Sequence, residues 1–408
     1  MRTPLNAVYR RIRLGTCRKT EQLVRCGLFG IGLAGLARTV YWIQSQRRAL
    51  EYVLPELRNW RCFLPLSAGG PLRTYIITHL FSKPTPLPTN VTLQTLIAPS
   101  LLLNNVSSTA LRQAREICGP DAEKSVPVPL RQYLPQTQSG HLNGVILWFH
   151  GGGYISGSSL YKDAYCGRLA ADTGCMVLST EYRLAPRDPF PRGFLDCIAA
   201  LIEASKMAKE QGIPLIISGV SAGGGLAAAS AQFAADAKIP VDLQALVYPM
   251  LDPASGWLQI KHEKPLGNFV WTRSANRYGW NSYLYGNRHV RVNRLINQVC
   301  KTHIVENAHI SARGVQSRDI WRYAIPGVRQ NLTGLAPAWI GCGDLDLFYP
   351  ECHTYAKRLQ ACGVPTQFSA VQGMYHGGDA AAPDAPAIRA FYDSMIDAIR
   401  ETIRSRAV

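Results

Sequence analysis

Short apolar runs alternate with longer amphipathic stretches from about residue 144 to the end of the chain. The apolar runs are almost continuous, which is typical of strands buried on both faces of a parallel sheet. The pattern predicts strands over 144–149, 175–181, 215–219, 243–248, 337–342 and 366–371. It predicts helices over 161–173, 193–211, 223–237, 353–362 and 385–405. The sequence therefore indicates an α/β fold with a mostly parallel, doubly wound sheet.

Two parts of the chain do not follow this alternation. Residues 253–330 are basic and rich in Trp, Tyr, Asn and Arg, and an interval this long predicts an insertion with its own structure, a helical lid. Residues 1–130 lack the strand–helix rhythm. We therefore expect an N-terminal segment over 1–50, a cap and linker over 51–130, and an α/β domain over 131–405 that contains the lid insertion.

The formal net charge of +17 is concentrated in two stretches. Residues 1–62 contain 12 Lys and Arg against 3 acidic residues, and residues 288–329 contain 8 against 2. No helix-turn-helix, zinc-finger or interleaved aromatic–basic pattern accompanies them, so we expect no nucleic-acid partner. Peripheral contact with an anionic membrane surface explains this positive charge better than nucleic-acid binding does.

The N-terminus is open to several interpretations. Residues 1–20 are basic and free of acids, as in transit peptides. Residues 26–37 are apolar but too few to span a bilayer, which needs about 20. A transit peptide, a weak signal anchor and a cap helix all remain open. We expect an intracellular protein. Peripheral or anchored association with a membrane through the N-terminus is the alternative. The sequence does not give the oligomeric state.

Neither the cysteines nor the histidines form a strong metal pattern. The 11 cysteines are scattered singly without a C-x-x-C pair, which argues against a disulfide framework and a structural zinc site. His303, Glu306 and His309 are spaced as ligands could be, yet they match no strong motif. We expect no metal and no cofactor.

A nucleophile signature lies between a predicted strand and a predicted helix. Residues 219–223, Gly-Val-Ser-Ala-Gly, match the G-x-S-x-G elbow, in which a sharp turn exposes the serine hydroxyl. Small neighbours let the strand and the helix approach, and the helix N-terminus favours negative charge nearby. The pattern alone is weak, but its strand–turn–helix context makes Ser221 the candidate nucleophile.

A base and an acid follow in the order that this elbow requires. His376 lies in a glycine-flanked loop after the last predicted strand, a context that the other histidines lack. Asp344 and Asp346 both follow the strand predicted over 337–342. Because carboxyl ends of parallel strands meet at one edge of the sheet, His376 and either aspartate can reach Ser221.

Three glycines follow the strand predicted over 144–149. A plain turn does not require Gly151, Gly152 and Gly153 in succession. A tetrahedral oxyanion needs preorganised N–H donors, which glycines present without a blocking side chain. We predict an oxyanion hole made by these three glycines and the N–H of Ala222.

Together these motifs resemble one family. His150-Gly-Gly-Gly, Gly-x-Ser-x-Gly, Tyr182-Arg-Leu-Ala-Pro with Phe190-Pro, and the late Asp and His are similar to the hormone-sensitive-lipase group of α/β-hydrolases. These are serine carboxylesterases, and the group includes arylacetamide-deacetylase-like enzymes. The resemblance covers about residues 140–405. It implies an α/β-hydrolase fold with a helical cap, to which residues 40–80 would contribute, and a lid helix over 271–284.

The resemblance also implies the acid and the activity. The family's Asp lies nine residues before the Tyr of a Tyr-Ala-x-x-Leu helix, here Tyr355, which selects Asp346 over Asp344. The chain departs from the family pattern at Val220, Glu181 and Gly378. We expect hydrolysis of small-molecule esters with hydrophobic acyl or aryl groups through an acyl-enzyme. Amide hydrolysis, deacetylation, acyl transfer or a tailoring step in a biosynthetic pathway are the alternatives, together with a binding protein on the same fold.

Overall fold

The computed structural model describes residues 49, 51–58, 91–95, 128–136, 141–257, 264–286 and 320–406. The chain divides into two compact units, Met1–Tyr52 and Val53–Val408. In the first unit, the Tyr52 N–H donates to the Ala49 carbonyl at 3.2 Å. The apolar run over 26–37, residues 303–309 and half of the predicted insertion lie outside the described residues. The predicted domain boundaries stay predictions.

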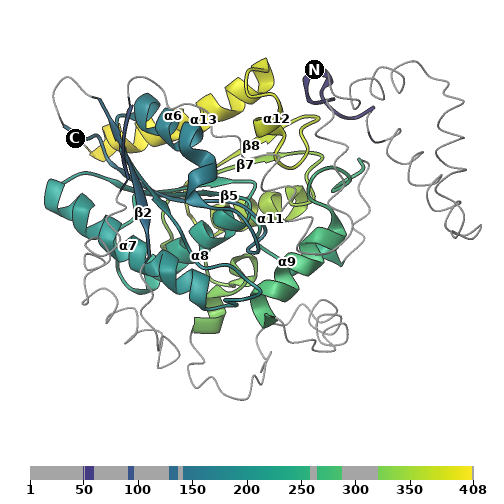
Figure 1. Cartoon of the computed structure of the whole chain (residues 1–408), viewed down its shortest axis with the longest axis horizontal. Coiled ribbons are helices and arrows are strands. Elements are labelled where there is room, and N and C mark those ends of the chain that lie inside the picture. Colours follow the sequence, from purple (N-terminus) through teal and green to yellow (C-terminus); the bar gives the residue numbers. More distant parts are fainter. Residues whose placement is uncertain are drawn as a thin grey trace, which may run out of the picture. The chain divides into compact units, whose positions relative to one another are not determined.

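An eight-stranded sheet forms the centre of the second unit, in the order β1-β2-β4-β3-β5-β6-β7-β8 (Figure 1). Neighbouring strands from β4 to β8 are parallel, and β1 and β2 are antiparallel to their neighbours. The predicted fold class is confirmed, and each predicted strand end lies within one residue of the observed end. The strands are β1 Val91–Thr95, β2 Leu130–Pro135, β3 Val145–Phe149, β4 Met176–Thr180, β5 Leu215–Val220, β6 Leu243–Val247, β7 Ala338–Gly343 and β8 Thr366–Val371.

The two antiparallel strands were not predicted, and β2 shows why. Its sequence, LRQYLP, carries polar residues that do not fit a continuous apolar run. Arg131 and Tyr133 are nevertheless buried, because both bind Asp163 of the helix below. The Arg131 guanidinium donates to both carboxylate oxygens at 3.1 and 2.9 Å, and the Tyr133 hydroxyl donates at 2.5 Å. Pairing makes the burial of these polar groups tolerable.

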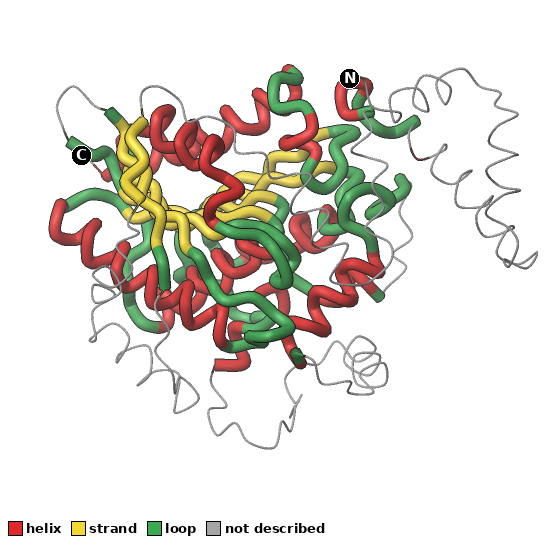
Figure 2. The backbone as a smooth tube through the Cα atoms, in the orientation of Figure 1, coloured by secondary structure: helices red, strands yellow, loops and turns green. Residues whose placement is uncertain are grey.

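Helices cover both faces of the sheet (Figures 1 and 2). α6 and α13 lie on one face, and α7, α8 and α11 lie on the other. The predicted start of α11 at residue 353 is four residues late, because Pro350 lies in its first turn, where proline is tolerated. The helices are α6 Asp163–Thr173, α7 Arg192–Gln211, α8 Ala222–Asp236, α9 Arg273–Tyr285, α11 Tyr349–Ala361, α12 Gly378–Ala381 and α13 Pro386–Arg406.

The core is continuous through the central strands. Every residue of β3, β4, β5, β6 and β7 is buried, as expected for strands that are covered on both faces. Helix α8 is rich in alanine and glycine and is buried over almost its whole length, so its backbone lies close to the sheet. Among the described helices, none combines the length and the apolarity that crossing a bilayer requires.

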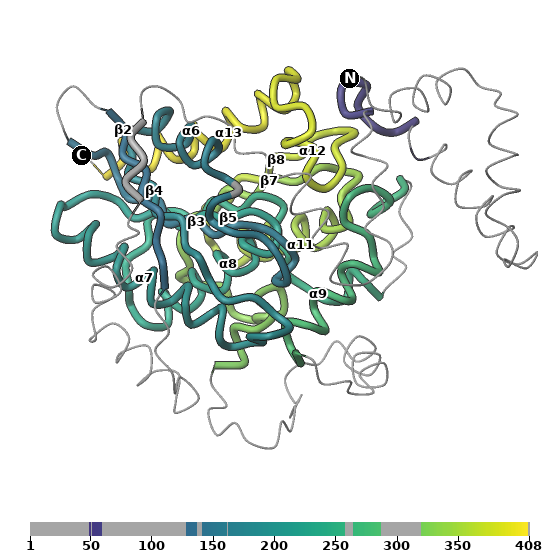
Figure 3. The backbone as a smooth tube through the Cα atoms, viewed as in Figure 1, coloured from purple at the N-terminus to yellow at the C-terminus, as the bar shows by residue number. Residues whose placement is uncertain are grey.

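Four loops lie at one edge of the sheet, where the parallel strands have their carboxyl ends. The loops follow β3, β5, β7 and β8, so residues that are far apart in the sequence become neighbours there (Figure 3). Ser221 and His376, which are 155 positions apart, are within hydrogen-bonding distance. Helix α9 lies within the predicted insertion, where a lid helix was expected.

Candidate active site

Ser221 occupies a strained turn between β5 and α8. Its φ of 58° and ψ of −120° are unusual for a residue other than glycine. The turn is held by the Ser221 N–H, which donates to the Val247 carbonyl at 2.9 Å, and by the Ser221 carbonyl, which accepts from the Gly225 and Met250 N–H groups at 3.0 and 2.9 Å. The surrounding backbone therefore fixes the direction of the hydroxyl.

The two glycines of the motif are needed because the backbone segments approach so closely. A Cβ at Gly219 would lie 2.4 Å from the Gly223 carbonyl oxygen. A Cβ at Gly223 would lie 2.1 Å from the Phe149 carbonyl oxygen. Neither position can hold a side chain without moving β3, β5 or α8.

The structure brings the three predicted residues Ser221, His376 and Asp346 together. Oγ of Ser221 lies 3.0 Å from Nε2 of His376, and Nδ1 of the same ring lies 2.8 Å from Oδ2 of Asp346. All three side chains are buried. One tautomer fits both contacts, with Nδ1 donating to the carboxylate and Nε2 accepting from the hydroxyl. These distances are within the range that proton transfer requires.

The two candidate acids have different partners. Asp346 is fully buried, and its second oxygen accepts the Phe348 N–H at 2.9 Å, which fixes the carboxylate. Asp344 accepts the Gly373 N–H at 2.7 Å and forms an ion pair with Lys264. Asp344 therefore holds the start of the loop that carries His376, and Asp346 is the aspartate that contacts the imidazole.

Three aromatic rings surround the imidazole of His376. The ring centroids of Tyr248, Phe348 and Trp271 lie 4.8, 5.1 and 6.2 Å from that of His376. The Tyr248 hydroxyl also donates to Asp379 at 2.7 Å. The sequence analysis did not predict a role for these aromatic residues. A signal was present for Tyr248, which ends the strand predicted over 243–248.

The glycine triplet forms a tight loop beside Ser221. A Cβ at Gly151 would lie 3.4 Å from Cβ of Ser221, and Gly152 and Gly153 have φ values of 126° and 60°. The Gly152 carbonyl accepts the N–H groups of Ile155 and Ser156 at 3.1 and 3.0 Å. In the described part of the chain, the N–H groups of Gly152, Gly153 and Ala222 donate to no protein acceptor. They are therefore available to a ligand.

The His150 side chain contacts this loop and stabilises it. Its Nδ1 lies 2.8 Å from the Gly151 carbonyl oxygen, and its ring stacks on Tyr182 with centroids 4.1 Å apart. The Tyr182 hydroxyl donates to the His150 carbonyl at 2.6 Å. Burial lowers the pKa of His150, which favours a neutral ring. Through these contacts His150 fixes the shape of the loop.

The sequence of this region matches a known family over residues 146–379, and the family is described as alpha/beta hydrolase fold. The chain belongs to it. An arylesterase from Saccharolobus solfataricus is 30% identical over 255 residues, which cover 61% of this chain and 72% of the relative. The arylacetamide deacetylase of Mus musculus is 28% identical over 288 residues, with 61% and 72% covered. The predicted resemblance to the hormone-sensitive-lipase group is thereby confirmed.

Solved structures agree with this membership in the α/β-hydrolase family. The structure of a bacterial heroin esterase has a TM-score of 0.63 and 27% sequence identity to this chain. The superposition covers 87% of this hydrolase and 99% of that esterase.

Helix α9, which lies in the predicted insertion, packs directly on the glycine loop of the hydrolase. Tyr154, just after the triplet, stacks on Tyr283 with centroids 4.0 Å apart and meets Trp280 edge-on at 5.2 Å. The Phe190 N–H donates to the Tyr283 carbonyl at 2.6 Å. The insertion is therefore tied both to the loop after β3 and to the loop before α7.

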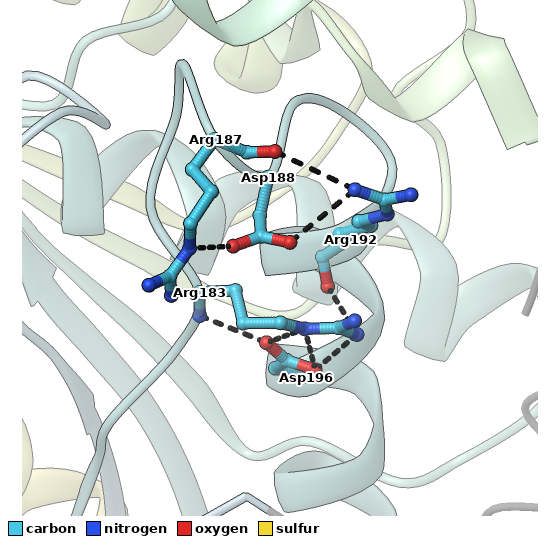
Figure 4. Close-up of polar contacts among 5 residues, drawn as sticks. All are labelled: Arg183, Arg187, Asp188, Arg192 and Asp196. Atoms are coloured by element: carbon cyan, nitrogen blue, oxygen red, sulfur yellow. Dashed lines mark hydrogen bonds and ion pairs between the residues drawn. The ribbon is translucent and has the colours of Figure 1, made fainter. Parts of the chain in front are cut away.

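A network of charged side chains stabilises the loop before α7 (Figure 4). Asp196 accepts the Arg183 backbone N–H at 2.8 Å, and its two oxygens accept from the Arg183 guanidinium at 2.7 and 2.9 Å. Nearer the surface, Asp188 accepts from Arg187 at 2.7 Å and from Arg192 at 3.3 Å. The pair of Arg183 and Asp196 fixes the start of this loop against α7. In the pairs that Asp188 forms, the arginine side chains are exposed to solvent.

Metal-binding chemistry has no support in the described residues of the hydrolase. No group of three or more His, Cys, Asp or Glu side chains there could hold a metal ion. The cysteines of these ranges form no disulfide, and burial raises the pKa of the Cys166, Cys175 and Cys352 thiols. His303, Glu306 and His309, which match no strong metal motif, lie outside the described ranges.

Proposed function

We propose that this esterase-type α/β hydrolase cleaves carboxylic esters with Ser221 as nucleophile, His376 as general base and Asp346 as the acid that orients the base. The observation that carries the proposal is the continuous chain of contacts from the Ser221 hydroxyl to the Asp346 carboxylate, 3.0 and 2.8 Å long. A serine hydroxyl is a weak nucleophile until a neighbouring base accepts its proton.

The reaction takes two steps. Oγ of Ser221 attacks the ester carbonyl while Nε2 of His376 takes the hydroxyl proton, and a tetrahedral intermediate forms. Its collapse breaks the C–O bond to the alcohol, which receives the proton from Nε2, and the acyl group stays on Ser221. Water then attacks the acyl-enzyme with His376 again as base, which releases the acid and restores the serine.

The glycine triplet and Ala222 stabilise the oxyanion of both intermediates. Backbone N–H groups of Gly151, Gly152, Gly153 and Ala222 surround the place where the carbonyl oxygen develops its charge. The free donors at Gly152, Gly153 and Ala222 support this assignment, as does the close approach of the Gly151 backbone to Ser221. One such donor contributes about 3 kcal/mol to transition-state stabilisation.

The substrates are esters with hydrophobic acyl or aryl groups. The aromatic rings of Tyr248, Trp271 and Phe348 around His376 make the surroundings of the scissile bond apolar. Relatives named arylesterase and ethyl acetate hydrolase support ester hydrolysis. Relatives named arylacetamide deacetylase support amide cleavage as a second reaction, in which His376 would protonate the leaving nitrogen.

Turnover of p-nitrophenyl butyrate by purified protein tests the proposal. We expect Ser221→Ala to lower kcat by roughly 10⁴-fold or more. The control is Ser230→Ala, the same change at a buried hydroxyl of α8 that has no hydrogen-bond partner among the described residues, which should leave kcat unchanged. A phosphonate ester should add its mass to the wild type and not to Ser221→Ala. Equal turnover by Ser221→Ala and the wild type would overturn the assignment.

A further inference from the structure

A short segment that precedes the sheet in the sequence contacts the loop that carries His376. Residues 53–58 form this segment, which contains the single turn η1, Pro55–Leu57. The Leu54 N–H donates to the Gly373 carbonyl at 3.0 Å. The Tyr375 hydroxyl donates to the Leu57 carbonyl at 3.2 Å. Both bonds join the segment to residues 373–378, which comprise the loop after β8 and the first residue of α12.

An apolar contact adds a third point of attachment. The Leu57 side chain is fully buried, and its Cδ1 would lie 3.0 Å from a Cβ built on Gly378. Leu57 therefore fits against this loop because residue 378 has no side chain. Gly378 does not have a positive φ, so a larger residue there would clash with its neighbours without straining its own backbone.

The segment also has a defined conformation of its own. Val53 is buried, and its carbonyl accepts from Nε of Arg58 at 2.9 Å. The Leu57 N–H donates to the Leu54 carbonyl at 2.9 Å. These bonds fix the Leu54 N–H and the Leu57 carbonyl in the orientation in which they meet the loop.

The three attachment points lie on both sides of His376 in the sequence. Gly373 and Tyr375 precede the histidine, and Gly378 follows it. The Tyr375 ring also contacts Phe269 of the predicted insertion, with centroids 5.5 Å apart. Because His376 must meet Ser221 and Asp346 at once, a displacement of about 1 Å is enough to impair proton transfer.

We propose that residues 53–58 are a positioning clamp for His376, with Leu57 as its main positioning residue. The clamp belongs to neither the sheet nor the lid helix, so the base of this hydrolase is held from upstream of the α/β domain. This inference rests on the proposed function, since it takes His376 as the base.

Full-length variants test the clamp. Leu57→Ala removes the apolar contact. Tyr375→Phe keeps the ring and removes the hydroxyl bond to the Leu57 carbonyl. Gly378→Ala places a Cβ against Leu57 and Met374. Glu56→Ala is the matched control, since Glu56 lies in the same turn and is exposed. Leu57→Met keeps the volume of the side chain and should restore the contact.

The expected signature is a fall in kcat with little change in KM. With p-nitrophenyl butyrate at 25 °C, Leu57→Ala should lower kcat roughly tenfold to hundredfold. Tyr375→Phe should lower it roughly twofold to tenfold. Glu56→Ala and Leu57→Met should match the wild type. The phosphonylation rate of Ser221 should fall in parallel with kcat, because the same base activates the serine.

Other results would overturn the clamp. If Leu57→Ala and Gly378→Ala lower Tm but leave kcat unchanged, the segment is only structural. If they raise KM with kcat unchanged, the segment shapes the substrate pocket. Should Leu57→Ala not fold, unchanged kcat in both Tyr375→Phe and Gly378→Ala also overturns the clamp. An inactive Ser221→Ala with an unaffected Leu57→Ala overturns the clamp alone, whereas an active Ser221→Ala overturns the proposed function and the clamp with it.

Discussion

The indole ring of Trp271 lies directly over Gly153: a Cβ built on that glycine would lie 2.0 Å from Cη2 of the ring. The centroid of the same indole lies 6.2 Å from that of His376. One side chain of the insertion therefore contacts the loop that we propose binds the oxyanion and lies beside the ring of the proposed general base. Trp271 therefore connects the predicted insertion to both the glycine loop and His376.

The first prediction concerns Gly153→Ala. The new methyl group would collide with the indole, and φ of 60° adds strain of about 1 kcal/mol for a residue with a Cβ. We expect kcat/KM to fall roughly hundredfold, as when an oxyanion donor is displaced. The double variant Gly153→Ala/Trp271→Ala should recover part of the loss, as measured in a double-mutant cycle. Strict additivity would contradict the collision.

The second prediction concerns substrate size. Trp271→Ala removes a large ring next to His376, so longer or bulkier acyl groups gain room. The ratio of kcat/KM for p-nitrophenyl octanoate to that for the acetate should rise roughly tenfold. Trp257→Ala is the control, because Trp257 packs under Arg277 with 5.1 Å between guanidinium and ring centroid and is not among the rings around His376. A similar rise in both variants would assign the effect to general loosening of the insertion.

The third prediction compares the two aspartates of Figure 4. Asp196→Ala leaves the largely buried Arg183 without its carboxylate and should reduce the free energy of unfolding by about 3 kcal/mol. Asp188→Ala removes pairs whose arginines are exposed and should cost about 0.5 kcal/mol. Urea denaturation measures both values. Equal losses would show that burial of Arg183 does not set the energy of this network.

The fourth prediction concerns pH and the segment that returns from the insertion. Asp236 accepts from both Arg329 terminal nitrogens at 2.8 Å and from the Tyr323 hydroxyl at 2.8 Å. The Arg329 hydrogen bonds lower the pKa of Asp236 below its usual value. The native state therefore keeps this carboxylate ionised at a pH where the unfolded chain already binds a proton.

The stabilisation from Asp236 is thus complete above its unfolded pKa of about 4 and is lost as the pH falls through the lower native pKa. Asp236→Asn should reduce the free energy of unfolding by about 1 kcal/mol at pH 7, and the difference should shrink below about pH 4. Asp384→Asn, at an exposed pair with Arg389, should have no effect. A constant difference between pH 7 and pH 3.5 would exclude the linkage.

The sequence predicted those features that depend on local pattern. Strands buried on both faces have continuous apolar runs, so β3 to β8 could be placed closely, and residues at their carboxyl ends could be expected to meet. Ser221, His376 and the pair Asp344 and Asp346 were singled out in this way, although this pattern alone did not separate the two aspartates. The acid was selected from the sequence only through the family resemblance.

Features that depend on tertiary partners could not be predicted. The sequence of strand β2 reads as a polar stretch, because the partner that allows Arg131 to be buried, Asp163, lies on another element. Trp271 is one aromatic residue of several in the insertion until it is found against Gly153 and His376. Leu57 lies in a part of the chain without periodic pattern, and its contact at Gly378 joins segments that no local rule connects.

The bond between Tyr375 and Leu57 joins residues 318 positions apart. During synthesis, Leu57 emerges from the ribosome long before its partner exists. At 5–20 residues per second the interval is roughly 15 to 60 s. Throughout that time the buried apolar side chains of residues 53–58 lack their native neighbours. The reactive centre must therefore be assembled among the last events of folding.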